Sequence, residues 1–166
     1  MKVMFNKTKV KSWIKKAHKD QSLTYGYGYI TDNSVLLVEE QHMHPTILEV
    51  YGTLTPECKY SAEQFQKLMN LPDSPVKVID SRLEYAPDPK NRLRIFYNPK
   101  TGIWLTIKGV YFDLLDNPKV HKFYTNEPMD RMWIVCNEEI VGVIAPVVLE
   151  DQLSHISFKA EEEAKQ

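Results

Sequence analysis

The residue types best suited to bind a metal gather between positions 39 and 45, which read Glu-Glu-Gln-His-Met-His-Pro. Two histidines at i and i+2 share one face of a strand, and a glutamate beside them could supply an oxygen ligand. A metal needs three or more ligands, and no motif places a third beside His42 and His44. The segment leaves two interpretations open, a metal-dependent enzyme or two loop histidines beside Pro45. We expect no cofactor and assign no metal ligand.

Tyrosine and glycine alternate from Tyr25 to Tyr29, a pattern that invites comparison with phosphate-binding loops. The segment lacks the three glycines of a dinucleotide fingerprint and the Gly-Lys-Ser/Thr ending of a P-loop. Because residues two apart share a strand face, we instead predict a strand over Leu23–Ile30. The chain also has no Gly-x-Ser-x-Gly elbow, and neither Cys58 nor Cys136 lies in a local activating context that the sequence reveals. We therefore assign no catalytic residue and expect a noncatalytic protein.

Lysines dominate the first 20 residues, which hold seven of them against one acid, Asp20. Apolar residues at the spacing of one helical face predict a helix over residues 8–18: Val10, Trp13, Ile14 and Ala17. The candidate nucleic-acid-binding residues are the five lysines of this helix: Lys9, Lys11, Lys15, Lys16 and Lys19. Like charges in neighbouring turns repel, and duplex DNA would relieve that repulsion and release counterions without sequence readout. The alternative is an amphipathic helix with a solvated lysine face.

A mixture of helices and strands must position these candidates. Ser61 and Gln64 have the spacing of a capping box, and they begin a second helix over residues 61–70. Short apolar runs predict a short helix at Val110–Asp116 and strands at Val35–Val38, Ile47–Tyr51, Val76–Tyr85, Arg92–Tyr97, Ile103–Ile107, His121–Thr125, Arg131–Cys136 and Ile140–Ile144. Because strands do not alternate with long helices, we predict an α+β fold, a mostly antiparallel sheet with two or three helices packed on one face. The first two helices should contact that face through Trp13, Ile14, Phe65 and Leu68.

Composition and length are those of an ordinary globular domain, with 43% hydrophobic and 26% charged residues in a chain of 166. We expect a single domain over residues 1–158, with a half-domain junction near 71–75, where two prolines interrupt regular structure. A charged tail follows over 159–166. The chain contains no apolar run of about 18 residues and no export signal, which predicts a cytoplasmic protein without a membrane partner.

Two segments late in the chain carry a resemblance to a known family. Residues 127–129 read Glu-Pro-Met before a predicted strand, and residues 145–149 read Ala-Pro-Val-Val-Leu after another. Together they resemble the end of bacterial and phage β-type DNA polymerase sliding clamps, which close with Met-Pro-x-Arg-Leu. The opening helix, the strands after it and the short helix at 111–115 are similar to a clamp half-domain. The closing sequence differs here and 17 residues follow it, which puts the clamp's partner-binding pocket in doubt.

The resemblance implies a noncatalytic, clamp-like accessory or adaptor protein of phage or mobile-element origin. It would associate with duplex DNA, without sequence preference, or with replication proteins, and the five lysines would face the DNA as the basic helices of a clamp do. A bacterial clamp chain has three such domains, so a closed ring of this shorter chain would be a homo-oligomer. Two alternatives remain: a protein-interaction module without nucleic-acid binding, and a metal-dependent enzyme that uses His42 and His44.

Overall fold

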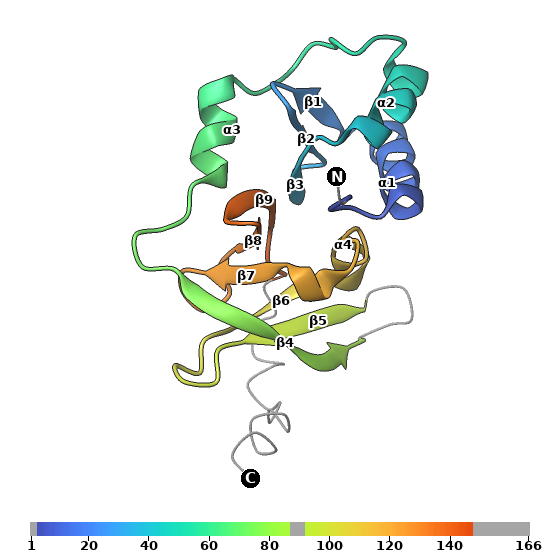
Figure 1. Cartoon of the computed structure of the whole chain (residues 1–166). Coiled ribbons are helices and arrows are strands. Elements are labelled where there is room, and N and C mark those ends of the chain that lie inside the picture. Colours follow the sequence, from blue (N-terminus) through green and yellow to red (C-terminus); the bar gives the residue numbers. More distant parts are fainter. Residues whose placement is uncertain (1–2, 87–91, 148–166) are drawn as a thin grey trace.

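The computed structural model describes residues 3–86 and 92–147, whose strands form one antiparallel sheet flanked by helices (Figure 1). The strands are β1 (Thr24–Gly26), β2 (Tyr29–Thr31), β3 (Val35–Val38), β4 (Val76–Tyr85), β5 (Leu93–Tyr97), β6 (Trp104–Lys108), β7 (Lys122–Thr125), β8 (Met132–Cys136) and β9 (Glu139–Ile144). Their order in the sheet is β1-β2-β3-β9-β8-β7-β4-β5-β6. The helices are α1 (Lys7–Lys19), α2 (His44–Tyr51), α3 (Ala62–Met69) and α4 (Gly109–Phe112), with the 3₁₀ turns η1 (Gln41–Met43) and η2 (Pro118–Val120). The prediction of an α+β fold with an antiparallel sheet is confirmed.

Helix α1 begins at a side-chain cap. The Asn6 side chain accepts a hydrogen bond from Lys9 N at 3.0 Å, which satisfies one free amide of the first turn. The buried residues of the helix are Val10, Ile14 and Ala17. Trp13, which we expected among them, is only half-buried, because its indole Nε1 reaches out to donate to Asp32 Oδ2 at 3.0 Å. The helix is therefore as predicted, and Trp13 packs against the hydrophobic core as a partly buried residue.

The tyrosine-glycine segment forms a hairpin instead of the single strand predicted over Leu23–Ile30. Strands β1 and β2 pair antiparallel, with Tyr25 opposite Ile30. The turn residues Tyr27 and Gly28 have φ angles of 54° and 83°, the backbone conformation of a type I′ turn. This turn matches the twist of the flanking strands, and glycine adopts its positive φ without steric cost. The single-strand prediction is wrong because Gly28 marks a turn, not one face of a strand.

The segment predicted as a strand over Ile47–Tyr51 belongs to helix α2. Pro45 lies in the first turn of that helix, where a missing amide hydrogen breaks no helical bond. Gly52 ends the helix in the left-handed conformation with a φ of 75°, and its amide donates to Leu48 O at 2.8 Å. These are the boundary signals of a helix, and they outweigh the apolar run that favours a strand.

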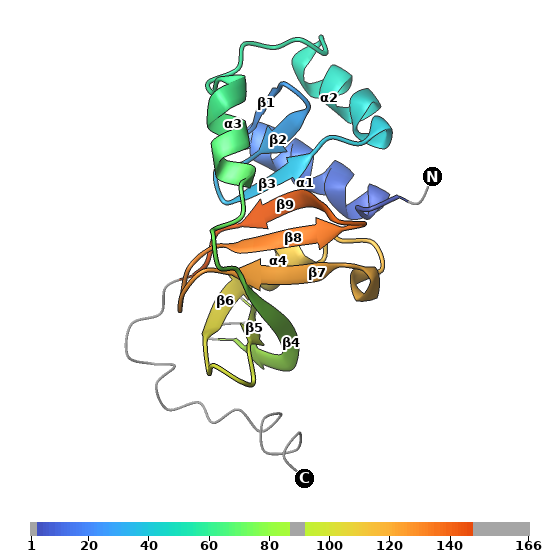
Figure 2. The same ribbon diagram turned by 60° about the vertical axis from the view of Figure 1, so that its left-hand side comes forward.

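The sheet carries helices on both faces (Figure 2). Alternate residues of a strand point to opposite faces, so Leu37 and Ile134 enter the larger core, whereas Leu36 and Trp133 enter the smaller one. Helices α1, α2 and α4 contribute to the larger core and so share one face of the sheet. Helix α3 packs on the smaller core through Phe65, on the face opposite to α1.

The position of α3 corrects a second expectation. Its capping box is present, since Gln64 N donates to Ser61 Oγ at 3.1 Å and Ser61 N donates to Gln64 Oε1 at 2.8 Å. The residues that face the sheet are Phe65 and Met69, which are buried, while Leu68 is 38% exposed. The i, i+4 pair therefore forms the packing stripe, and Leu68 is not the core anchor that we expected beside α1.

The sheet bends at β4, where the pairing with β5 shifts between Asp80 and Glu84 and Arg82 has a φ of 63°. A bulge of this kind lets a strand turn sharply. Beyond it, β5 and β6 turn back over the larger core, to which they contribute Phe96, Leu105 and Ile107. Val147 N donates to Thr106 O at 2.8 Å, and Thr106 Oγ1 donates to Val147 O at 2.6 Å. The segment after β9 thus joins β6, and the sheet nearly closes around its core.

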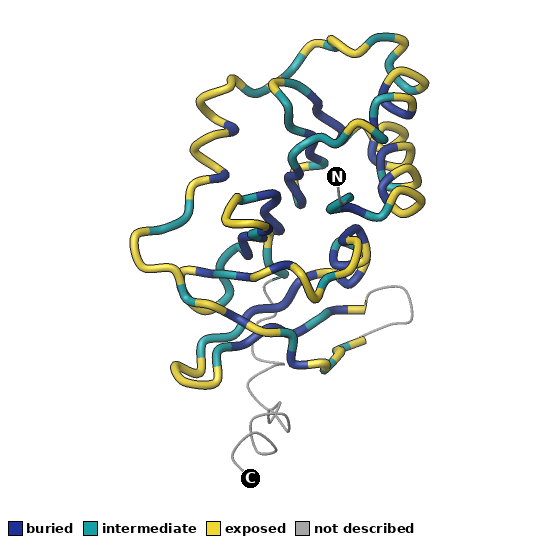
Figure 3. The backbone as a smooth tube through the Cα atoms, viewed as in Figure 1, coloured by how far each residue is buried: buried dark blue, intermediate teal, exposed yellow. Residues whose placement is uncertain are grey.

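In Figure 3, buried residues concentrate along the strands at the centre of the sheet. Along α1 and α3, exposed residues alternate with buried ones. Residues 71–75 link α3 to β4 without regular structure, and one sheet includes strands from both sides of them. The helix predicted over Val110–Asp116 is shorter, because the chain leaves α4 after Phe112 and Leu115 bridges to Phe5. The tail predicted over 159–166 lies outside the described residues.

Candidate nucleic-acid interface

The five candidate lysines lie on two separate stripes of α1. A helix turns by about 100° per residue, so residues four apart share a side. One stripe, at positions i, i+4 and i+8, contains Lys11, Lys15 and Lys19. The other contains Lys9 and Lys16, with Trp13 between them along the helix. The structure therefore does not bring the five lysines together on one surface.

The first stripe borders α2. Lys15 Nζ lies 3.4 Å from Glu49 Oε1, and these side chains are 45% and 59% exposed. Ion pairs this exposed contribute only about 0–1 kcal/mol to stability. The pair nevertheless places a negative charge beside the stripe, which lowers the positive potential available to a ligand there.

The second stripe borders a cleft of about 520 Å³, which we call the basic cleft, between α1, the turn after β2 and the start of α4. Four cations line it: Lys9, Lys16, Arg92 and Lys108. Two aromatic rings and three carboxylates also line it: Trp13, Tyr111, Asp20, Asp32 and Asp113. The cations come from α1, from the residue before β5 and from the last residue of β6. Two of the five candidate lysines thus meet two cations from distant parts of the sequence.

Asp32 organises the basic cleft. Its Oδ2 accepts hydrogen bonds from Trp13 Nε1 at 3.0 Å and from the Tyr111 hydroxyl at 3.1 Å. Its Oδ1 accepts from the backbone amides of Ser34 and Val35, both at 2.9 Å. Four donors therefore satisfy this carboxylate within the protein. Burial raises the pKa of the Tyr111 hydroxyl, a hydrogen bond with Ser34 lowers it, and Asp32 raises it further.

The backbone holds Arg92 and Lys108 at the cleft. Gly109 N donates to Arg92 O at 2.8 Å, directly after Lys108. A Cβ on Gly109 would lie 3.2 Å from that oxygen, so a side chain at this position would push the two segments apart. Among the residues that the structure describes, none of the four cleft cations forms an ion pair.

Four residues with side chains of metal-ligand type, none of them assigned as a ligand, form two adjacent pairs that we call the histidine-glutamate knot: Glu39, Glu40, His42 and His44. Glu40 Oε1 lies 2.9 Å from His42 Nε2 and accepts from Phe5 N at 3.0 Å. Glu40 Oε2 accepts from Met4 N at 2.9 Å. The side chains of His42 and Glu40 are 14% and 12% exposed. Glu40 thus fastens the N-terminal segment to the η1 turn.

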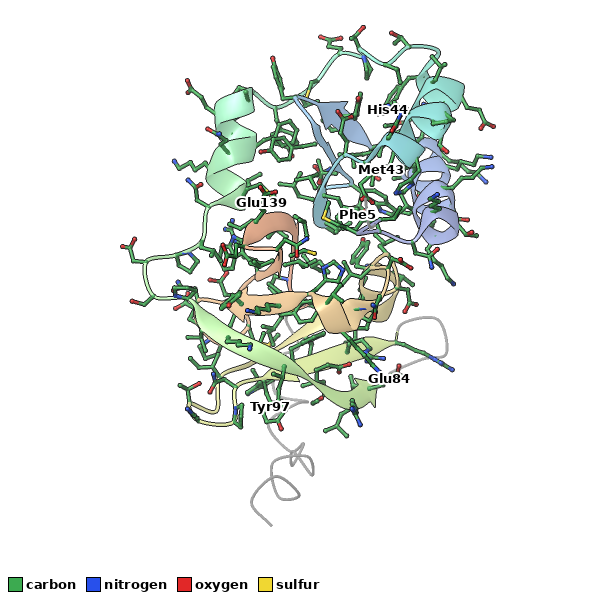
Figure 4. The ribbon with its side chains drawn as sticks, viewed as in Figure 1. Phe5, Met43, His44, Glu84, Tyr97 and Glu139 are labelled. Atoms are coloured by element: carbon green, nitrogen blue, oxygen red, sulfur yellow. The ribbon has the colours of Figure 1, made fainter. Side chains whose placement is uncertain are left out.

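The other two residues of the knot, Glu39 and His44, form a separate pair. His44 Nε2 lies 3.4 Å from Glu39 Oε2, and the Tyr25 hydroxyl donates to the same oxygen. In Figure 4, His44 lies near the top of the molecule and Phe5 lies below Met43. The two histidines therefore face two different carboxylates. In residues 3–86 and 92–147, no group of three His, Cys, Asp or Glu side chains is arranged to hold a metal ion.

Of the four cations that line the basic cleft, the sequence identified only two. It identified Lys9 and Lys16, but Arg92, Lys108 and Tyr111 reach the cleft only through strand pairing that no local motif reveals. Asp32 carried one local signal, because an aspartate two residues before Ser34 favours a turn that accepts backbone amides. That signal predicts the turn, but it does not predict that Asp32 accepts hydrogen bonds from Trp13 and Tyr111.

No helix within the described residues is both long and apolar enough to cross a membrane. The chain matches no protein-family model, no curated protein and no solved structure. The site is a cleft with two oriented aromatic rings and four cations that have no ion-pair partner among the described residues.

Proposed function

We propose that this protein is a noncatalytic accessory or adaptor protein that associates with nucleic acid through the basic cleft and the adjoining face of α1. The observation that carries the proposal is the convergence of four cations without an ion-pair partner among the described residues. Phosphates of a nucleic acid are the ligands that such a surface suits best. Contacts to phosphates carry no sequence information, so no sequence preference is expected.

The carboxylates at the cleft predict weak binding. Asp32 is satisfied by four internal donors, whereas Asp20 and Asp113 remain beside the cations. The excess of positive charge is therefore modest. We expect dissociation constants of about 10⁻⁴ to 10⁻⁶ M at physiological salt, the range of non-specific DNA binding.

The resemblance to sliding clamps also predicts an accessory role at nucleic acid, and that role stays a prediction. The association with replication proteins, a homo-oligomeric ring and a phage or mobile-element origin depend on that resemblance alone. Catalysis with a metal at His42 and His44 is less favoured, because each histidine already faces a glutamate of the knot. If α1 faces DNA as in a clamp, the cleft side would lie toward the duplex and α3 would lie away from it.

A salt titration of duplex DNA binding tests the proposal. We would compare the unmodified protein with a Lys9→Ala/Lys16→Ala variant, and with Lys11→Ala/Lys19→Ala as a control that removes the same charge from the other stripe. Each phosphate contact contributes about 0.9 to the slope of log K against log salt. The slope should therefore fall by about 1.8 in the cleft variant and stay nearly unchanged in the control.

Two results would contradict the proposal. Equal losses in the two variants would mean that lysines bind by general charge and that the cleft has no special part. Absence of binding of any nucleic acid, duplex or single-stranded, by the unmodified protein even at about 50 mM salt would remove nucleic acid as the ligand. Protein interaction through the apolar groove of about 400 Å³ that includes Leu36, Tyr60 and Leu68 would then be the better hypothesis.

A further inference from the structure

We infer that the basic cleft binds an unpaired nucleotide of a single-stranded nucleic acid, with the base against Trp13 and the flanking phosphates on the cleft cations. The inference rests on the proposed function and specifies the form of nucleic acid. It also gives the aromatic rings a role in binding. Cations alone can bind the phosphates of a duplex or of a single strand, whereas aromatic rings can stack on unpaired bases.

The two aromatic rings of the cleft are held in place before any ligand arrives. Trp13 belongs to α1 and Tyr111 to α4, yet both donate to the same Oδ2 of Asp32, at 3.0 and 3.1 Å. Asp32 is in turn held by two backbone amides. A ring that is already oriented loses little conformational freedom when a base stacks on it, and that favours binding.

Trp13 is the ring that can stack. It is half-buried and lines the cleft, so part of its indole surface is accessible there. The tryptophan lies between Lys9 and Lys16, which are about 10 Å apart along the helix axis. A base on the indole would therefore have a cation on either side for the phosphates of its strand. Stacking of bases on aromatic rings beside a basic surface is the usual way in which proteins bind single strands.

The size of the cleft favours an unpaired base. Its volume of about 520 Å³ falls within the range of small-ligand sites, about 300–1,000 Å³. The bases of a duplex are stacked and paired, and they would have to flip out to enter. A duplex would thus contact only the cations at the rim, whereas a single strand could contact both the cations and the ring.

A free nucleotide offers the same base and phosphate chemistry as a nucleotide within a strand. The number of phosphates separates the two, because only a strand can occupy the cations on both sides of Trp13. A strand should therefore bind more tightly than thymidine monophosphate, and with a steeper salt dependence.

The test measures binding of the full chain to a thymidine oligonucleotide of about eight nucleotides, to a duplex of equal length and to thymidine monophosphate. Binding is followed by anisotropy of the labelled oligonucleotide and duplex and, for the monophosphate, by its displacement of the labelled strand. We expect the strand to bind about 5-fold or more tightly than the duplex. Trp13→Leu should lower the ratio of strand affinity to duplex affinity toward one, while Trp13→Phe, which retains a ring, should keep most of that ratio.

The outcomes separate this inference from the proposed function. Salt-dependent duplex binding without a preference for the strand, or equal losses for strand and duplex in Trp13→Leu, would overturn the inference and leave the proposed function intact. No binding of either nucleic acid would overturn both. If thymidine monophosphate binds as tightly as the strand, the ligand of the cleft is a free nucleotide and not a strand. If Trp13→Leu does not fold, the strand-to-duplex ratio of the unmodified protein and the Trp13→Phe variant still decide the question.

Discussion

The histidine-glutamate knot and the basic cleft each contain a carboxylate that gathers donors from distant parts of the chain. In the knot, Glu40 accepts the amides of Met4 and Phe5 and also faces His42. In the cleft, Asp32 accepts four donors from three segments. The two regions differ in their cations. Both histidines of the knot face a glutamate, whereas the lysines and arginine around Asp32 form no ion pair among the described residues.

The difference shows that residue type is a poor guide to a binding site unless the hydrogen-bond partners are known. The knot contains the residues that a metal site would use, yet their polar atoms bond to one another and to the backbone. The cleft contains ordinary lysines, yet it leaves charge available to a ligand. We therefore expect substitutions in the knot to change stability and substitutions of the cleft lysines to change binding.

Glu40→Ala should have the largest effect on stability. It would leave the buried or partly buried amides of Met4 and Phe5 without an acceptor and would loosen Phe5, which is fully buried. A donor left without a partner costs about 1–3 kcal/mol, so we expect the free energy of unfolding in urea to fall by about 3 kcal/mol. Glu49→Ala is the matched control, since Glu49 is 59% exposed and its loss should cost less than about 1 kcal/mol. Similar losses for the two variants would show that the knot is not structural.

Asp32→Asn should cost less, about 1–2 kcal/mol. If the side-chain oxygen keeps accepting from Ser34 and Val35, the amide group must face two donors, Trp13 Nε1 and the Tyr111 hydroxyl. The hydroxyl can rotate to accept, but the indole N–H cannot. Urea unfolding would measure the loss, and the tryptophan emission should also shift. An unchanged emission together with unchanged stability would mean that Asp32 does not hold the rings.

Tyr25 should make the knot sensitive to alkaline pH. Burial, together with the hydrogen bond to Glu39 and its charge, raises the pKa of Tyr25 from 10.0 to about 12. Between these values the unfolded chain loses the proton and the folded chain keeps it, so this contribution to stability is complete below pH 10 and is lost as the pH rises toward 12. Urea midpoints measured across this interval should fall less steeply in Tyr25→Phe than in the unmodified protein. Parallel curves would contradict the prediction.

Much of the fold could be predicted because its signals are local. The capping box at Ser61 and the apolar spacing of α1 depend on residues a few positions apart, and both are found in the structure. The hairpin at Tyr27 and the helix after Pro45 were missed, although a positive-φ glycine and an N-terminal proline are also local signals. The face occupied by α3 could not be predicted, because it depends on how the chain crosses the sheet between α2 and α3.

The candidate site was less predictable than the fold. Apolar spacing identified the helix and its lysines, but the helical period alone does not say which stripe of lysines borders a cleft. Arg92 and Lys108 join Lys9 only because β5 and β6 pair and Gly109 bonds to Arg92 O. Contacts of this kind depend on tertiary packing. Sequence patterns therefore identified the cationic helix and not the cleft.

The smallest expected effect on stability separates the neighbours Lys15 and Lys16. Both lie on the exposed surface of α1, so Lys15→Ala and Lys16→Ala should each change the free energy of unfolding by less than about 0.5 kcal/mol. Lys15 faces Glu49, whereas Lys16 lines the basic cleft. In the duplex salt titration, Lys16→Ala should therefore lower the slope by about 0.9, and Lys15→Ala should leave it nearly unchanged. Because the two variants remove the same side chain from adjacent positions of one helix, a difference between them can come only from where each lysine points. Equal slopes would mean that the cleft lysine has no special part in binding.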